Sequence, residues 1–185
     1  MNFIETQIPG MLILEPKVFG DARGYFLESY NKKAWHNAGV TADFVQDNES
    51  FSRRGVLRGL HYQLPPHNQA KLVRVIRGEV IDVVVDIRKG SPTFGKHVKV
   101  LLSGENMRQL WVPHGMAHGF AVLSEEVLFS YKCDRFYAPE FERTILFNDP
   151  ALNIEWPYPE SEMILSPKDI NGVPLAAAEL PESFE

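Results

Sequence analysis

The chain has 185 residues with a formal net charge of -5, and 44% of them are hydrophobic and 23% charged. This size predicts one domain, residues 1–185, with a substantial core, and the acidic balance argues against nucleic acid or an anionic membrane as the main partner. Cys133 is the only cysteine, so no internal disulfide can form and we expect a cytoplasmic protein in which this thiol fills space. The N-terminus lacks a signal-peptide pattern and no run of 18 apolar residues follows, so we expect no membrane span.

The N-terminal part predicts a hairpin and a single short helix. After an apolar segment at residues 11–16, the Gly-Asp and Arg-Gly pairs within residues 18–30 indicate a hairpin turn. Residues 31–39 predict the helix, with Asn31 as its N-cap and Gly39 as its C-terminal stop. Residues 44–52 then predict a strand that ends in polar side chains.

The middle of the chain has the two-residue period of β-strands. Residues 71–77 and 80–87 both alternate, and the Gly78-Glu79 turn between them predicts that they pair as a hairpin with a firm apolar face. Further strands are predicted at residues 97–102, 109–113, 119–123 and 127–133. Short strands at such intervals indicate a closed antiparallel barrel or jelly roll, followed by a tail with one or two helical turns.

Polar and titratable side chains crowd residues 53–63 and 71–77, inside what otherwise reads as a β core. Each buried charge is costly unless it is paired or hydrogen-bonded. This stretch is therefore the first place to expect a functional site.

Two segments are similar to the signatures of the cupin barrel. Pro113, Gly115 and His118 match the second signature, and the first begins with Gly55, five residues and then His61. Gln63 and Lys71, however, stand where metal-binding cupins carry a second His and a Glu. A protonated lysine repels a cation, but it can stabilise a developing oxyanion. The resemblance implies an all-β, cupin-type antiparallel jelly roll with a few short helices, and we expect no metal and no cofactor.

A longer match covers nearly the whole chain. It comprises residues 52–63, 69–75, 82–88, 91–95, 117–120, 131–132, 148–150 and 165–169. In these segments the sequence resembles the dTDP-4-dehydrorhamnose 3,5-epimerase family. The resemblance implies an isomerase that epimerises dTDP-4-dehydro-6-deoxy-D-glucose at carbons 3 and 5 to dTDP-4-dehydro-L-rhamnose, through an enolate, in dTDP-L-rhamnose biosynthesis. It also implies a homodimer that exchanges N-terminal strands, and a C-terminal tail that packs on the barrel.

The same resemblance assigns four catalytic residues. It implies that His61 is the base, that Asp169 orients it, that Lys71 stabilises the enolate oxygen and that Tyr131 is the acid on the opposite face. Taken singly, these residues would read as a core histidine, a loop or cap carboxylate, a lysine at the rim and a barrel aromatic.

Further positions match those that the family uses for the nucleotide and the sugar. They are Arg23, Glu28, Gln46, Asp47, Asn48, Arg58, Lys71, His118, Glu142 and Lys168, with Phe19, Phe26 and Tyr137 as stacking surfaces. Arginine suits a diphosphate because the planar guanidinium makes two parallel hydrogen bonds. Isolated charges such as Arg23 and Glu28 are also common on solvated strands.

Three alternatives remain open at this point. One is a metal cupin that uses His61, His67, His114 and His118 as ligands. Another is a non-catalytic carbohydrate-binding β-sandwich. The third is an enzyme of the same fold that epimerises only carbon 3 or isomerises the keto group.

Overall fold

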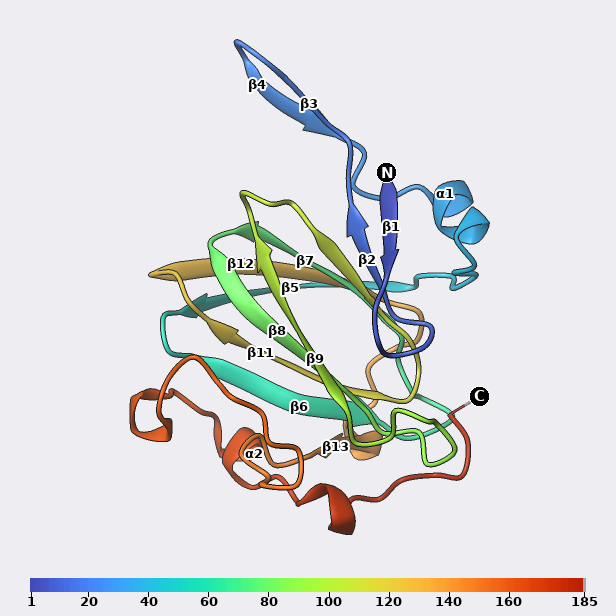
Figure 1. Cartoon of the computed structure of the whole chain (residues 1–185), viewed down its shortest axis with the longest axis vertical. Helices are drawn as coiled ribbons and strands as arrows, with labels where there is room; N and C mark the ends of the chain where they lie inside the picture. The colour runs from blue at the N-terminus through green and yellow to red at the C-terminus, as the bar shows by residue number, and fades with distance from the viewer. Residues whose placement is uncertain (185) are drawn as a thin grey trace.

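The computed structural model describes residues 1–184, which form thirteen strands and five short helices (Figure 1). One sheet has six strands: β1 (Asn2–Glu5), β2 (Leu12–Glu15), β10 (Gln109–Val112), β7 (Lys71–Arg77), β12 (Glu126–Cys133) and β5 (Gln46–Arg53), in this spatial order. The second sheet has five: β13 (Glu142–Thr144), β6 (Leu57–Gln63), β11 (Met116–Val122), β8 (Glu79–Asp86) and β9 (His97–Ser103). The other elements are β3 (Val18–Asp21), β4 (Gly24–Leu27), α1 (Lys32–Asn37), α2 (Pro167–Ile170) and the 3₁₀ turns η1 (Pro139–Phe141), η2 (Glu160–Glu162) and η3 (Leu175–Ala177).

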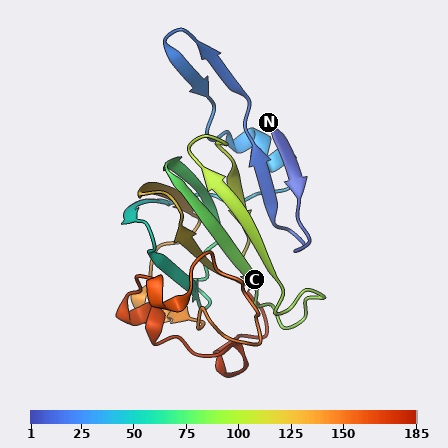
Figure 2. The ribbon, with the colours of Figure 1, turned by 60° about the vertical axis from the view of Figure 1, so that its left-hand side comes forward.

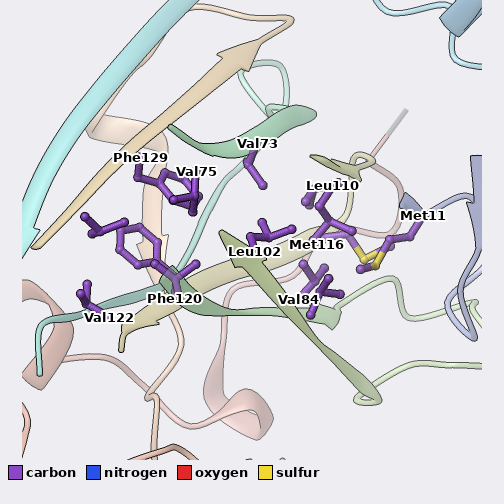
Figure 3. Close-up of a cluster of buried hydrophobic side chains, with 14 of the residues drawn as sticks. Met11, Val73, Val75, Val84, Leu102, Leu110, Met116, Phe120, Val122 and Phe129 are labelled. Atoms are coloured by element: carbon purple, nitrogen blue, oxygen red, sulfur yellow. The ribbon is translucent and has the colours of Figure 1, made fainter. Parts of the chain in front are cut away.

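The two sheets pack face to face, and their inner faces form the main core (Figure 3). Val73 and Val75 of β7 meet Val84 of β8, while Phe120 of β11 stacks on Phe129 of β12 with ring centroids 4.3 Å apart. Burying a side chain of this size contributes about 1.5–3 kcal/mol. All pairings within the sheets are antiparallel, and the arrangement is the expected cupin-type jelly roll.

The C-terminal segment covers the outer face of the five-stranded sheet (Figure 2). Val83 and Val85 of β8 pack there against Ile145, Leu152 and Leu175. Strand β8 is therefore buried on both faces, which explains why its sequence is almost continuously apolar.

Helix α1 covers part of the outer face of the six-stranded sheet. Trp35 packs beside Leu14, Leu72 and Trp111. The predicted N-cap is confirmed, because the side chain of Asn31 accepts a hydrogen bond from the backbone N–H of Ala34 at 3.2 Å.

The predicted hairpin between residues 71–77 and 80–87 is wrong. Strand β7 lies in the six-stranded sheet and β8 in the five-stranded sheet, so the chain turns a corner at Gly78 instead of folding back on itself. Gly78 has φ +87, and a Cβ there would lie 2.1 Å from the backbone oxygen of Glu126. The alternation correctly predicts which side chains share a face, but it does not determine which strand is the neighbour. Strands β1 and β13 were not expected, because segments of only three or four residues carry little periodic signal.

The hairpin of β3 and β4 is confirmed, and it projects away from the barrel in both views (Figures 1 and 2). Phe19, Tyr25 and Phe26 are 52%, 60% and 68% exposed. Large apolar side chains gathered on a projecting element are typical of a contact surface. Among residues 1–184, no helix is both long enough and apolar enough to cross a membrane.

Candidate active site

A pocket of about 330 Å³ opens between the two sheets, beyond the stacked rings of Phe120 and Phe129. The walls come from β5, β7 and β12 on one side and from β6 and β11 on the other. Of the residues that the sequence singled out, ten line it: Gln46, Asn48, Arg58, His61, Lys71, His118, Tyr131, Tyr137, Glu142 and Lys168. Alternation along the strands turns these polar side chains inward, so the tertiary fold converts separate polar positions into one site.

His61 and Asp169 form a hydrogen-bonded pair at this pocket. Nε2 of His61 lies 2.7 Å from Oδ1 of Asp169, which comes from α2. The same Oδ1 accepts the backbone N–H of Gly59 at 3.0 Å, and Oδ2 accepts the hydroxyl of Ser166 at 2.5 Å. Asp169 therefore has two roles: its side chain completes the capping box of α2, whose N-cap is Ser166, and it is the partner of the imidazole.

These contacts fix the charge states of the pair. Burial alone would raise the pKa of Asp169, but the hydrogen bonds from His61, Ser166 and Gly59 lower it to about 2. Burial lowers the pKa of His61; the hydrogen bond to Asp169 opposes this effect, and the nearby charges of Lys168 and Lys71 add to it. The pair therefore consists of a carboxylate and a neutral imidazole near neutral pH. Since the carboxylate holds the N–H on Nε2, the lone pair remains on Nδ1.

Lys71 stands at the start of β7, on the face that carries Val73 into the core. Burial lowers the pKa of its ammonium, and the smaller opposing influences come from Cys133, its cross-strand neighbour on β12, and from the carboxylates of Glu142 and Asp82. No carboxylate or hydrogen-bond acceptor contacts Nζ within residues 1–184, and the ammonium lies over the ring of Tyr131, 5.9 Å from the centroid. A partly buried cation without a counter-ion is well placed to bind a negative oxygen of a ligand.

Tyr131 lies on β12, opposite Asn48 of β5. Burial raises the pKa of its phenol, with smaller contributions from Cys133 and Glu142. The buried thiol of Cys133 has a pKa raised to about 11, also by burial, so it stays protonated and acts as a space-filling group near neutral pH.

A second imidazole-carboxylate pair lies beside the first. Nε2 of His118 is 2.9 Å from both oxygens of Asp82, whose side chain is fully buried. His118 is the cross-strand neighbour of His61. The alternation of residues 80–87 places Asp82 on the face opposite Val83 and Val85, but the sequence analysis gave it no role. A carboxylate within an apolar strand was the signal that could have found it.

The mouth of the pocket carries a small polar network. Glu142 accepts hydrogen bonds from Lys168 and from the hydroxyl of Tyr137, both at 2.8 Å. Burial alone would raise the pKa of Glu142, but these two hydrogen bonds outweigh burial and lower it. Glu142 is thus a carboxylate that holds α2 and the loop of Tyr137 at the entrance.

Five of the predicted substrate contacts lie outside this chain's own pocket. Asp47 points to the outer face of β5 and pairs with Lys132 at 2.9 Å, because only the even-numbered residues of β5 face inward. Phe19, Arg23 and Phe26 lie on the projecting hairpin and Glu28 just after it. Arg23 pairs with Asp21 in solvent.

The four histidines of the metal alternative do not converge. His61 and His118 each have a carboxylate partner, His114 pairs with Asp134 at a separate hollow of about 1000 Å³, and His67 packs on Phe141. Within residues 1–184 no group of three or more His, Cys, Asp or Glu side chains is arranged to hold a metal ion.

The fold and the site define a class, the cupin-like barrels with an acid-base pocket built from histidine, lysine and tyrosine side chains. Residues 5–177 match the family model for dTDP-4-dehydrorhamnose 3,5-epimerase. The chain belongs to the dTDP-4-dehydrorhamnose 3,5-epimerase family, which consists of isomerases.

Individual relatives and solved structures are similar to the chain over most of its length. The chain is 61% identical to a dTDP-4-dehydrorhamnose 3,5-epimerase of Shigella flexneri over 93% of this chain and 94% of that protein. It matches a crystal structure of an epimerase from Legionella pneumophila in complex with dTDP-4-keto-L-rhamnose, with a TM-score of 0.94, 53% identity and 98% of each chain covered. It also matches a 3′-monoepimerase from Streptomyces bikiniensis, with a TM-score of 0.86 and 36% identity over 92% of this chain and 86% of that one.

Proposed function

We propose that this chain epimerises dTDP-4-dehydro-6-deoxy-D-glucose at carbons 3 and 5 to dTDP-4-dehydro-L-rhamnose, a step of dTDP-L-rhamnose biosynthesis. The observation that carries the proposal is a single pocket in which His61, backed by Asp169, shares the space with Lys71 and Tyr131. The ketone at carbon 4 acidifies the hydrogens on both neighbouring carbons, so the reaction requires a base, an oxyanion stabiliser and an acid.

His61 is the proposed base, and Nδ1 is the atom that takes the proton. Asp169 holds the hydrogen on Nε2, and its carboxylate stabilises the imidazolium that forms. The depressed pKa of the imidazole keeps it neutral and ready to accept a proton near neutral pH.

Lys71 is the proposed stabiliser of the enolate oxygen. Its ammonium has no counter-ion within the described residues, so its charge is available to the substrate oxygen that becomes negative. In this pocket it would supply the electrostatic stabilisation that a metal ion provides in other cupins.

Tyr131 is the proposed acid. It comes from the six-stranded sheet, whereas His61 comes from the five-stranded sheet, so the two groups reach the sugar ring from opposite walls. Removal of a proton on one face and delivery on the other inverts the carbon. The raised pKa of Tyr131 keeps its proton in place until the carbanion forms.

Gln46 and Asn48 of β5 and Arg58 are proposed to bind the nucleotide diphosphate, with His118, Glu142, Lys168 and Tyr137 around the sugar. We also propose a homodimer in which the hairpin of one subunit brings Phe19, Arg23, Phe26 and Glu28 to the pocket of its partner. The exposed aromatic rings of the hairpin and its distance from its own pocket support this arrangement.

A single domain and a cytoplasmic location remain predictions, the latter resting on one buried free cysteine.

Proton NMR of the dTDP-4-keto sugar incubated with the enzyme in heavy water tests the function. We expect deuterium at carbons 3 and 5 and formation of the L-lyxo product. Exchange at carbon 3 alone would reassign the chain as a single-centre epimerase, a class that shares this fold. Binding without exchange would reduce the site to a sugar-nucleotide binding pocket.

A further inference from the structure

Ser50 of β5 carries a polar group that the reaction described above does not use. Its side chain lines the pocket, and its Oγ is buried. Within residues 1–184 this hydroxyl has no hydrogen-bond partner. Buried hydroxyls are normally satisfied, so an orphan that faces a ligand pocket indicates a partner that arrives with the ligand.

The neighbours of Ser50 on the same face of β5 all have partners. Gln46 donates to the side chain of Asn48 at 3.0 Å, and the amide of Asn48 contacts Sγ of Cys133 at 3.7 Å. Ser52 accepts the Nε–H of Arg58 at 3.1 Å. The cross-strand neighbour of Ser50 is Phe129, whose ring carries no polar atom and cannot accept a conventional hydrogen bond.

The position of Ser50 indicates which part of a ligand it meets. Asn48, two residues before it, pairs across the sheet with Tyr131, and Ser52, two residues after it, holds Arg58. Each such step along a strand is about 7 Å. Ser50 therefore lies between the proposed acid, which acts on the sugar ring, and the arginine proposed for the diphosphate.

We propose that Ser50 is a substrate-binding residue whose hydroxyl donates a hydrogen bond to an oxygen of the sugar-linked phosphate. In a glycosyl diphosphate only a few bonds separate this phosphate from the sugar ring. A ring beside Tyr131 would therefore place the phosphate near Ser50, between Tyr131 and Arg58. The inference rests on the proposed function, because it uses the nucleotide-sugar as the ligand. It predicts that Ser50 contributes to affinity and to the placement of the ring, whereas His61, Lys71 and Tyr131 carry the chemistry.

The test compares three ligands by titration calorimetry against the wild type and Ser50→Ala. Thymidine monophosphate lacks the second phosphate, dTDP has it, and the dTDP-4-keto sugar adds the ring. We expect the substitution to weaken dTDP roughly tenfold or more, because the lost bond involves a charged acceptor, and to leave the monophosphate within about twofold. The KM for the sugar substrate should rise similarly while kcat changes by less than about threefold.

Ser130→Ala is the matched control. Ser130 lies beside Tyr131 on the same strand, but on the outer face of the sheet, so all three affinities should match the wild type. Unchanged dTDP binding by Ser50→Ala would overturn the proposal, whether or not the sugar substrate were affected. Equal losses for monophosphate and diphosphate would also overturn it. Failure of the proposed function would look different, since the wild type itself would then not exchange the protons of the sugar, whether or not it bound dTDP.

Discussion

Nε2 of His61 and Oδ1 of Asp169 lie 2.7 Å apart, although the two residues are separated by 108 positions in the chain. The imidazole comes from the second strand of the five-stranded sheet and the carboxylate from a one-turn helix near the C-terminus. The carboxylate is held by Gly59 and Ser166 as well, so it is fixed before any substrate binds. This pre-organisation lets the imidazole present one defined nitrogen to the pocket.

Replacing the proposed base should remove nearly all turnover. We expect His61→Ala to lower kcat by about 10²- to 10⁴-fold, because a positioned base typically contributes that much. Deuterium incorporation measured by NMR gives the rate at each carbon. His36→Ala, at an exposed position of α1, is the control and should retain wild-type rates. Near wild-type exchange by His61→Ala would refute the assignment of the base.

The pH dependence should report the depressed pKa of His61. The base works only when neutral, so kcat/KM should fall on the acid side, with a midpoint below the usual imidazole pKa of 6.5. Asp169→Asn removes an interaction that raises this pKa, so the acid limb should move to still lower pH while kcat drops because the ring loses its orientation. A limb that moves to higher pH in this variant would contradict the proposed pairing.

Lys71→Met should impair chemistry more than nucleotide binding. Loss of one oxyanion donor costs on the order of 10²- to 10³-fold in kcat, and methionine preserves most of the side-chain volume. Binding of dTDP, which has no enolate oxygen, should change far less. Burial lowers the pKa of this ammonium, so the lysine should lose its proton, and the wild-type rate should decline, at a pH below the ordinary lysine pKa of 10.5. A variant that turned over normally would show that the charge is not needed.

Tyr131→Phe separates proton removal from proton delivery. The variant keeps the base and the ammonium, so deuterium exchange should persist at one carbon while epimerisation at the other is impaired more strongly. NMR in heavy water distinguishes the two carbons in one sample. Small and equal effects at both centres would argue that another group, or water, supplies the proton.

Mixed dimers test whether the hairpin serves the neighbouring subunit. Homodimers of Arg23→Ala and of His61→Ala should both be inactive. In a hybrid of the two, the pocket that keeps His61 receives the hairpin that keeps Arg23, so one of the two sites is intact. Half of randomly formed dimers are hybrids, so refolded mixtures should recover about a quarter of wild-type activity. Light scattering checks that the mixtures are dimeric. If the hairpin acted on its own barrel, or not at all, mixing would restore nothing beyond the sum of the two variants.

The local patterns of the sequence anticipated much of the fold. Alternation at residues 80–87 correctly predicted that Val83 and Val85 share one face and Asp82 lies on the other, because side-chain direction along a strand depends only on position. Asn31 was correctly identified as a helix cap, since capping involves only the nearest residues. The pairing of β7 with β8 was wrong, because strand neighbours depend on how whole sheets close around the core.

By itself, the sequence determined the fold class, the family and the residue types of the site, because these follow from short-range patterns and from motifs such as residues 113–118. Only the tertiary structure decided which of those residues meet. It brought Asp169 to His61, left Lys71 without a counter-ion among residues 1–184, turned Asp47 outward and set the hairpin away from its own pocket. The physical reason is that contacts between distant segments depend on the packing of two sheets and a C-terminal cover, which no local pattern specifies.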